Sequence, residues 1–290
     1  MHIIFWLLAV IFLAACAPAS INLPYLGHSN TRAPTGTFPE PAQFSYQKLA
    51  EDSQVNELPW EETEHYRSFK VRLPHKLPEE TQKSFLEFTF YKSKLADKEK
   101  LIIVLSTYSQ RQFHRFPMLN LGAYLTAWNP YADFNVALLE EQEGDDPFDL
   151  DALKDLNSEE DNMRWMRESA RRFRKIVVGI RRMLDWAEKE SSIDMSRVGI
   201  AGFSTSAPIV AVAMGIDPRI SAAAIFLGSA NFHEVLAQSE EVRMKTWRER
   251  SLERSGQSRE DFAAHAYSIL DPINPLRHSS SIDPGRVLYF

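Results

Sequence analysis

Two kinds of hydrophobic pattern follow one another along the chain. In residues 69–73 and 86–90, apolar and polar side chains alternate, which predicts two strands that are each buried on one face only. Residues 101–105 and 134–139 are almost continuously apolar, as expected of strands that are buried on both faces. The sequence therefore predicts a sheet that is half exposed at its beginning and enclosed further along the chain.

Helical patterns separate the later strands. Ser158, with Asp161 three residues on, forms the start signal of a long helix along which apolar residues recur at helical spacing. A second helical stretch is expected at residues 119–128. Strand, helix and strand continue at residues 197–201, 208–215 and 222–227. Buried strands that alternate with helices predict an α/β fold, in which a mainly parallel sheet has helices on both faces.

Composition narrows the classes of protein and site. A chain of 290 residues that is 44% hydrophobic is typical of a globular protein and excludes a disordered one. The single cysteine excludes disulfide scaffolds, cysteine-based zinc sites and iron–sulfur clusters. The 33 basic against 39 acidic residues give a net charge of −6, which disfavours nucleic-acid binding. No histidine spacing typical of a metal site is present, and nothing in the sequence indicates a cofactor.

The first sixteen residues have the features of a targeting signal. Residues 3–14 form an uncharged apolar run, too short to span a bilayer permanently but of the length of a signal-peptide core. Ala15 and Cys16 follow, and this arrangement resembles a bacterial lipobox. The resemblance implies a signal peptide at residues 1–15 and a lipid anchor on Cys16, placed in the cell envelope and there at the outer membrane. The alternatives are an ordinary secretory signal with a chance cysteine, or a buried N-terminal strand.

The residues after the signal predict a spacer and then one folded domain. Residues 16–60 are rich in proline and show no helical period, which is typical of an extended tether. A lipid anchor needs such a spacer to hold a folded domain away from the membrane. We therefore expect the folded domain at residues 61–290.

A short motif between the strand at 197–201 and the next helix carries the candidate chemistry. Residues 202–206 read Gly-Phe-Ser-Thr-Ser, with Ser204 at the tip of a sharp turn that needs small residues two positions away on each side. The motif resembles the nucleophile elbow of the α/β-hydrolase superfamily, in its dienelactone-hydrolase and prolyl-oligopeptidase-like branch. Ser206 departs from the pattern, which has glycine there. A serine that merely caps the helix is the structural alternative.

The resemblance extends over about residues 65–290. Segments that flank the elbow also resemble the superfamily, at residues 185–186, 193–200 and 217–220. The resemblance implies that Ser204 is the nucleophile and that the backbone N–H of Thr205 forms half of an oxyanion hole. The second donor is expected in the loop after the third strand of that fold, and Tyr108 is our choice.

Residues 233–268 are expected to form a helical lid. Two helical patterns are present, at residues 239–254 and after a capping residue near Ser258. Insertions at this place commonly cover the site in the superfamily. Two interpretations of the lid arginines stay open: orientation of an acidic substrate, or charges on a solvated surface. The residues concerned are Arg243, Arg248 and Arg250.

The acid and the base of a triad are not evident in the chain. In this superfamily the acid and then the histidine follow the serine. The resemblance places residues 284–290 in the strand that precedes them, so we expect both residues beyond Phe290 and an incomplete fold. His114, in the region of the oxyanion loop, is the candidate base within the chain. Asn231 follows the strand after which some relatives keep their acid, but an amide does not stabilise an imidazolium as a carboxylate does. Weaker candidates, on the lid or at the wrong edge of the sheet, are His265, Asp271, His278 and Asp283.

Together these features predict a serine hydrolase that cleaves an ester or related acyl bond of a small-molecule substrate through an acyl-enzyme on Ser204. The lipid on Cys16 would hold it on the periplasmic face of the outer membrane. Two alternatives stay open. One is a hydrolase-like binding domain without activity, and the other is a truncated gene product that lacks the acid and histidine.

Overall fold

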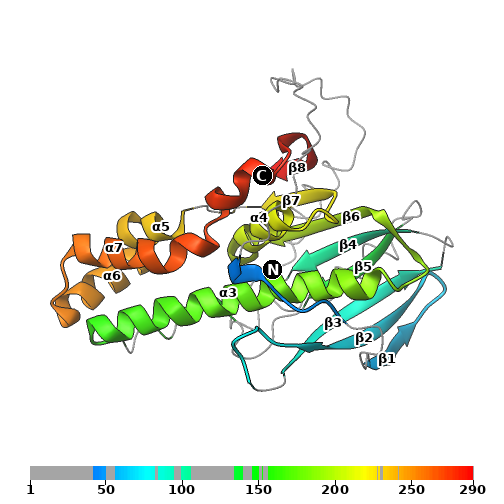
Figure 1. The fold of residues 1–290 in the computed structure, drawn as a ribbon, viewed down its shortest axis with the longest axis horizontal. Helices are drawn as coiled ribbons and strands as arrows, with labels where there is room; N and C mark the ends of the chain where they lie inside the picture. The colour runs from blue at the N-terminus through cyan, green and yellow to red at the C-terminus, as the bar shows by residue number, and fades with distance from the viewer. Residues whose placement is uncertain are drawn as a thin grey trace, which may run out of the picture. The chain divides into compact units, whose positions relative to one another are not determined.

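A mixed sheet forms the centre of the fold (Figure 1). Among the described residues it has eight strands, which lie in the order β1 (Asn56–Glu62), β2 (Tyr66–His75), β3 (Ser84–Ser93), β5 (Phe134–Leu139), β4 (Glu99–Leu105), β6 (Ile193–Phe203), β7 (Ala222–Phe226) and β8 (Val287–Tyr289). The pairs β1–β2, β2–β3 and β3–β5 are antiparallel, whereas β5, β4, β6, β7 and β8 pair in parallel. The α/β class is confirmed, with an antiparallel region at the β1 edge.

The computed structural model describes residues 42–49, 56–81, 84–94, 99–105, 134–139, 146–149, 152, 156–226, 228, 231–240 and 242–289. The chain divides into two compact units, Met1–Ala33 and Pro34–Phe290, and all described residues belong to the second. The predicted signal peptide, Cys16, Tyr108, His114 and the helix expected at 119–128 lie outside the described residues.

The longest helix packs on one face of the sheet. It is α3 (Glu159–Ala187), and it begins where the sequence predicts, because the Ser158 hydroxyl accepts a hydrogen bond from the Asp161 N–H at 3.1 Å. Helix α4 (Ala207–Ile216) lies beside α3. The remaining helices are α5 (Phe232–Gln238), α6 (Val242–Ser255) and α7 (Arg259–Leu270), with short 3-10 helices at Ala42–Phe44, Ser204–Ser206, Asp271–Ile273, Pro275–Ser281 and Pro284–Arg286. Within the described ranges, no helix is both long and apolar enough to cross a membrane.

The central strands are buried on both faces, as their sequence predicts. On β4, Leu101 and Ile103 join the main core with α3, whereas Val104 points to the opposite face and joins a second, smaller cluster. On β5, Leu139 belongs to the main core and Leu138 to the smaller cluster. The side chains of successive strand residues point to opposite faces, so a continuous apolar run supplies two cores at once.

The folded part begins earlier than the predicted boundary at residue 61. Residues 42–49 and β1 fall within the segment that we predicted as a tether, yet Phe44 is fully buried. On β1, the Glu57 carboxylate accepts a hydrogen bond from the indole of Trp186 at 3.1 Å. The prediction failed because the prolines suggested a linker. Pro59 is tolerated in β1 because this strand lies at the edge of the sheet.

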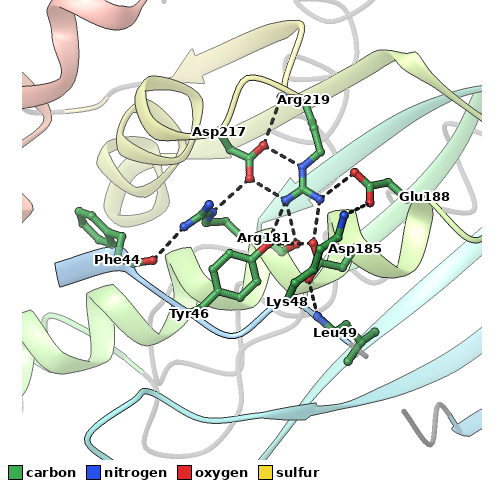
Figure 2. A network of polar contacts seen from close by, with 9 residues as sticks. All are labelled: Phe44, Tyr46, Lys48, Leu49, Arg181, Asp185, Glu188, Asp217 and Arg219. Atoms are coloured by element: carbon green, nitrogen blue, oxygen red, sulfur yellow. Dashed lines mark hydrogen bonds and ion pairs between the residues drawn. The ribbon is translucent and has the colours of Figure 1, made fainter. Parts of the chain in front are cut away.

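A buried network of charges holds the segment around Tyr46 against α3 (Figure 2). The Arg219 guanidinium donates hydrogen bonds to Asp185 at 2.8 Å and to Asp217 at 2.7 Å. The Tyr46 hydroxyl donates to Asp185 at 2.8 Å, and the Leu49 N–H donates to the other oxygen of that carboxylate at 2.8 Å. Burial, followed by the hydrogen bond to Asp185, raises the pKa of Tyr46 to about 12. The network therefore fixes the N-terminal segment of the fold.

Helices α5, α6 and α7 form an extension beside the N-terminal part of α3 (Figure 1). At about 1.5 Å per residue, α3 is about 43 Å long, whereas a seven-residue strand such as β4 covers about 23 Å, so α3 projects beyond the sheet. The projecting end of α3 packs against the extension through Trp165, whose ring lies 5.7 Å from that of Trp247 on α6. The Ser251 hydroxyl on α6 adds a buried hydrogen bond to Asn162 on α3 at 2.6 Å.

Candidate active site

Ser204 occupies a strained turn directly after β6. Its φ angle is 55°, and Ser204 and Asn231 are the only described residues other than glycine with a positive φ. Holding a residue with a side chain in this region costs about 1–3 kcal/mol, and such strain is concentrated at functional sites. The Ser204 side chain is exposed, at the edge of the sheet where the parallel strands end. The turn thus has the sharp geometry that the sequence predicts.

Gly202 lets the strand and the helix approach each other. A Cβ atom on Gly202 would lie 2.6 Å from Cγ2 of Val210 on α4 and 2.9 Å from the backbone oxygen of Ser206, distances that real Cβ atoms do not adopt. No side chain fits there without displacing α4 from β6. The requirement for a small residue two positions before Ser204 is therefore a packing requirement of the turn.

Ser206, which departs from the superfamily pattern, has a structural role of its own. It is fully buried, and its hydroxyl accepts a hydrogen bond from the Phe203 N–H at 2.8 Å and donates one to the Phe203 carbonyl at 3.0 Å. Both backbone groups of the residue before Ser204 are thereby satisfied. The serine replaces a glycine of the pattern without opening the turn.

The capping alternative for Ser204 does not describe this turn. The residue at the N-cap of α4 is Ser206, and the Ser204 hydroxyl makes no hydrogen bond within the described part of the chain. Thr205, whose N–H is the expected oxyanion donor, follows in the same 3-10 helix and is partly buried. Ser204 thus presents a hydroxyl that none of the described residues engages in a hydrogen bond.

None of the described histidines forms a hydrogen bond with Ser204. His278 packs beneath the far end of α4, where a Cβ on Gly215 would lie 2.7 Å from the His278 Cβ, and its ring centroid is 5.6 Å from that of Phe44. Burial lowers the pKa of His278 below its ordinary value. His265 on α7 lies 2.8 Å from the Gln257 side chain. The others are His65 between β1 and β2, His75 on β2 and His233 on α5.

The residues considered as replacements for the acid of a triad are Asp271, Asp283 and Asn231, and the two aspartates have other partners. Asp271 forms an ion pair with Arg277, and the Asp283 side chain accepts a hydrogen bond from the Gly285 N–H at 2.9 Å. Asn231 lies after β7, at the same edge of the sheet as Ser204. Among the residues that the structure describes, no group of three His, Cys, Asp or Glu side chains could hold a metal ion.

Neither interpretation of the lid arginines applies to Arg248. It is fully buried on α6, and its guanidinium donates hydrogen bonds to the carbonyls of Leu236 at 3.2 Å and Ser239 at 2.9 Å. These carbonyls belong to the end of α5, so Arg248 caps that helix. Arg250 is exposed, and the side chain of Arg243 lies outside the described residues.

Comparison with solved structures supports the fold. The chain is similar to an acetyl xylan esterase from Paenibacillus sp. R4, with 14% identity and a TM-score of 0.54 over 86% of this chain and 75% of that one. It is also similar to acetyl xylan esterase 1 from Thermoanaerobacterium sp. JW/SL YS485, with 14% identity and a TM-score of 0.50 over 88% of each chain. No protein-family model and no curated protein sequence matches the chain. The fold is thus of the kind found in α/β-hydrolase-type esterases.

Proposed function

We propose that the protein is an ester hydrolase that uses Ser204 as its nucleophile. The observation that carries the proposal is the exposed Ser204 hydroxyl, held at φ 55° between β6 and α4 and without a hydrogen-bond partner in the described part of the chain. A strained turn of this kind costs stability, so we expect it to serve a function. A nucleophile elbow needs such a turn to expose its serine. The esterase folds of the similar structures support the same class of reaction.

The proposed reaction proceeds in two steps. The Ser204 oxygen bonds to the ester carbonyl carbon, its proton passes to a general base, and the alcohol leaves with a proton as the acyl-enzyme forms. Water then hydrolyses the acyl-enzyme and releases the acid. The N–H of Thr205 and a donor at Tyr108 would stabilise the oxyanion. The base is a group outside the described residues, for which His114 is the candidate in the sequence.

Helices α5 to α7 would serve as the lid of this site. They are attached to the projecting end of α3, beyond the edge of the sheet where Ser204 lies (Figure 1). Buried contacts such as that of Ser251 with Asn162 attach α6 firmly to α3. The lid would therefore be a fixed wall that shapes the substrate site.

Labelling with a fluorophosphonate probe tests the nucleophile. The wild-type protein should be labelled, and Ser204→Ala should abolish both labelling and hydrolysis of 4-nitrophenyl acetate. Ser280→Ala, which removes another exposed serine hydroxyl, is the matched control and should be labelled like the wild type. His114→Gln should reduce labelling strongly if His114 is the base.

A binding domain without activity is the second candidate. The observation that favours it is that none of the described histidines forms a hydrogen bond with Ser204. This function predicts a folded wild-type protein that the probe does not label and that hydrolyses no ester. Labelling that depends on Ser204 would exclude it.

The lipid anchor is a separate part of the proposal and rests on the sequence around Cys16. Expressed with its signal in a bacterium, the wild-type protein should incorporate labelled palmitate and partition into detergent. Cys16→Ser should abolish both properties. Incorporation that persists in this variant would contradict the assignment.

A further inference from the structure

The chain leaving β7 lies directly against the Ser204 turn. Phe203 and Phe226 are paired in register, so β6 and β7 reach the same level at the edge of the sheet. Two residues after β7, a Cβ on Gly228 would lie only 2.7 Å from the Cβ of Ala207, the first residue of α4. Asn231 follows three residues later and is therefore at most about 11 Å from Gly228.

Asn231 has the second positive φ among the described non-glycine residues, 73°, and a buried side chain holds it there. The Asn274 side chain is almost fully buried. Its oxygen accepts hydrogen bonds from the backbone N–H groups of Asn231 at 3.1 Å and Leu276 at 3.2 Å. Its nitrogen donates to the side-chain oxygen of Asn231 at 3.2 Å.

These bonds fix the orientation of both amides. Two backbone N–H groups donate to one end of the Asn274 amide, so that end must be the oxygen. The nitrogen of Asn274 is then the end that faces Asn231. That nitrogen requires an acceptor, so the oxygen of Asn231 faces Asn274 and its nitrogen, Nδ2, faces away. Asn231 is partly exposed, and its Nδ2 has no hydrogen-bond partner within the described part of the chain.

The loop that carries this donor is fixed at its other end as well. The hydroxyl of Tyr289 on β8 donates a hydrogen bond to the carbonyl of Gly228 at 2.6 Å. Tyr289 thus fixes the backbone at Gly228, and Asn274 fixes Asn231 three residues later. A donor held in this way loses little conformational entropy when a ligand binds to it.

We infer that the Nδ2 of Asn231 donates a hydrogen bond to an oxygen of the alcohol part of the substrate and so selects esters of polyhydroxylated alcohols, such as sugars. This inference rests on the proposed function and names a substrate class for the same site. An unpaired donor favours a substrate that offers an acceptor oxygen over one that offers only apolar atoms. Asn231 is then a specificity residue, and Asn274 is its positioning residue.

The test compares two acetate esters that share the acyl group. One is a monoacetylated methyl glycoside, whose free hydroxyls supply acceptors, and the other is phenyl acetate, whose ring offers only apolar atoms. Asn231→Gly removes the amide and suits the positive φ, whereas Asn231→Asp keeps the acceptor for Asn274 and replaces Nδ2 by a carboxylate oxygen. Gln238→Glu, an exposed amide-to-carboxylate change at the end of α5, is the matched control.

For the sugar ester, we expect kcat/KM to fall about 3- to 10-fold in Asn231→Gly, which lacks the donor. The loss should be smaller in Asn231→Asp, because a sugar hydroxyl can turn its hydrogen toward the carboxylate and donate instead of accept. For phenyl acetate, kcat/KM should stay within twofold in both variants. In Gln238→Glu, kcat/KM should stay within twofold for both esters. Equal losses for both esters, or no loss for either, would overturn the inference while leaving the esterase intact. If the wild-type protein hydrolyses neither ester and is not labelled, the proposed function fails and the inference falls with it.

Discussion

The hydroxyl of Ser206 hydrogen-bonds to both the N–H and the carbonyl of Phe203, the residue that precedes Ser204. One side chain thus closes the strained turn from within. A serine hydroxyl can do this because it donates one hydrogen bond and accepts others. The residue that departs from the glycine of the superfamily pattern is therefore the one that stabilises the turn in this protein.

Removing this hydroxyl should destabilise the fold. Ser206 is fully buried, so water cannot replace the lost partner of the Phe203 backbone. We expect Ser206→Ala to lower the free energy of unfolding by about 1–3 kcal/mol. Ser206→Gly, although it restores the superfamily pattern, should cost at least as much, because it also adds backbone freedom to the unfolded chain. Urea unfolding measures both, with Ser280→Ala as the control; a stable Ser206→Ala protein would show that the two bonds are not needed.

Two glycines of β6 should differ in how much stability they lose on substitution by alanine. At Gly202 the added Cβ would meet Val210 at 2.6 Å and the Ser206 backbone at 2.9 Å, so α4 must move. At Gly199 the nearest atoms are backbone oxygens at 3.9 Å, an ordinary contact. Gly202→Ala should cost more than about 2 kcal/mol and abolish probe labelling, whereas Gly199→Ala should cost less than about 1 kcal/mol. Similar thermal unfolding midpoints for the two variants would contradict the packing account.

The sequence was sufficient for features that depend on local pattern. The strands at 69–73, 86–90 and 134–139 and the start of α3 at Ser158 are confirmed, because periodicity and a capping side chain act over a few residues. The Gly202–Ser206 motif likewise predicts the turn without help from distant residues.

Features that depend on partners far along the chain were missed. Asn274 is 43 residues from Asn231, and no spacing rule joins them. Strand β1 was taken for tether because its place in the fold depends on pairing with β2 and on the hydrogen bond from Trp186 to Glu57. Arg248 was interpreted as a lid charge, since a sequence does not show that the end of α5 needs a cap.

The Arg219 network should be the most sensitive electrostatic feature of the fold. Asp185 and Asp217 are almost fully buried and both accept hydrogen bonds from Arg219 (Figure 2). Burial alone would raise the pKa of Asp217, but the hydrogen bonds and charge of Arg219 lower it below its ordinary value. Arg219→Met leaves buried carboxylates short of a counter-charge and should cost about 3–5 kcal/mol.

A second substitution distinguishes charge from packing in this network. Adding Asp217→Asn to Arg219→Met removes one uncompensated carboxylate, so part of the lost stability should return, by about 1 kcal/mol or more. Urea unfolding of the two single variants and the double variant gives the coupling. Strictly additive losses would mean that Arg219 contributes packing alone.

His75 should make the fold labile in acid. It lies almost fully buried at the end of β2, and burial, followed by the positive charges of Arg182 and Lys175, lowers its pKa from 6.5 to about 3. Between these values the unfolded chain binds a proton that the folded protein does not, so stability is lost as the pH falls from about 6.5 toward 3. From pH 7 to pH 4 this loss amounts to roughly 3 kcal/mol. His75→Leu cannot titrate, so its free energy of unfolding should decline less over that range, by the same roughly 3 kcal/mol. Parallel pH profiles for the wild type and His75→Leu would show that another group causes the acid sensitivity.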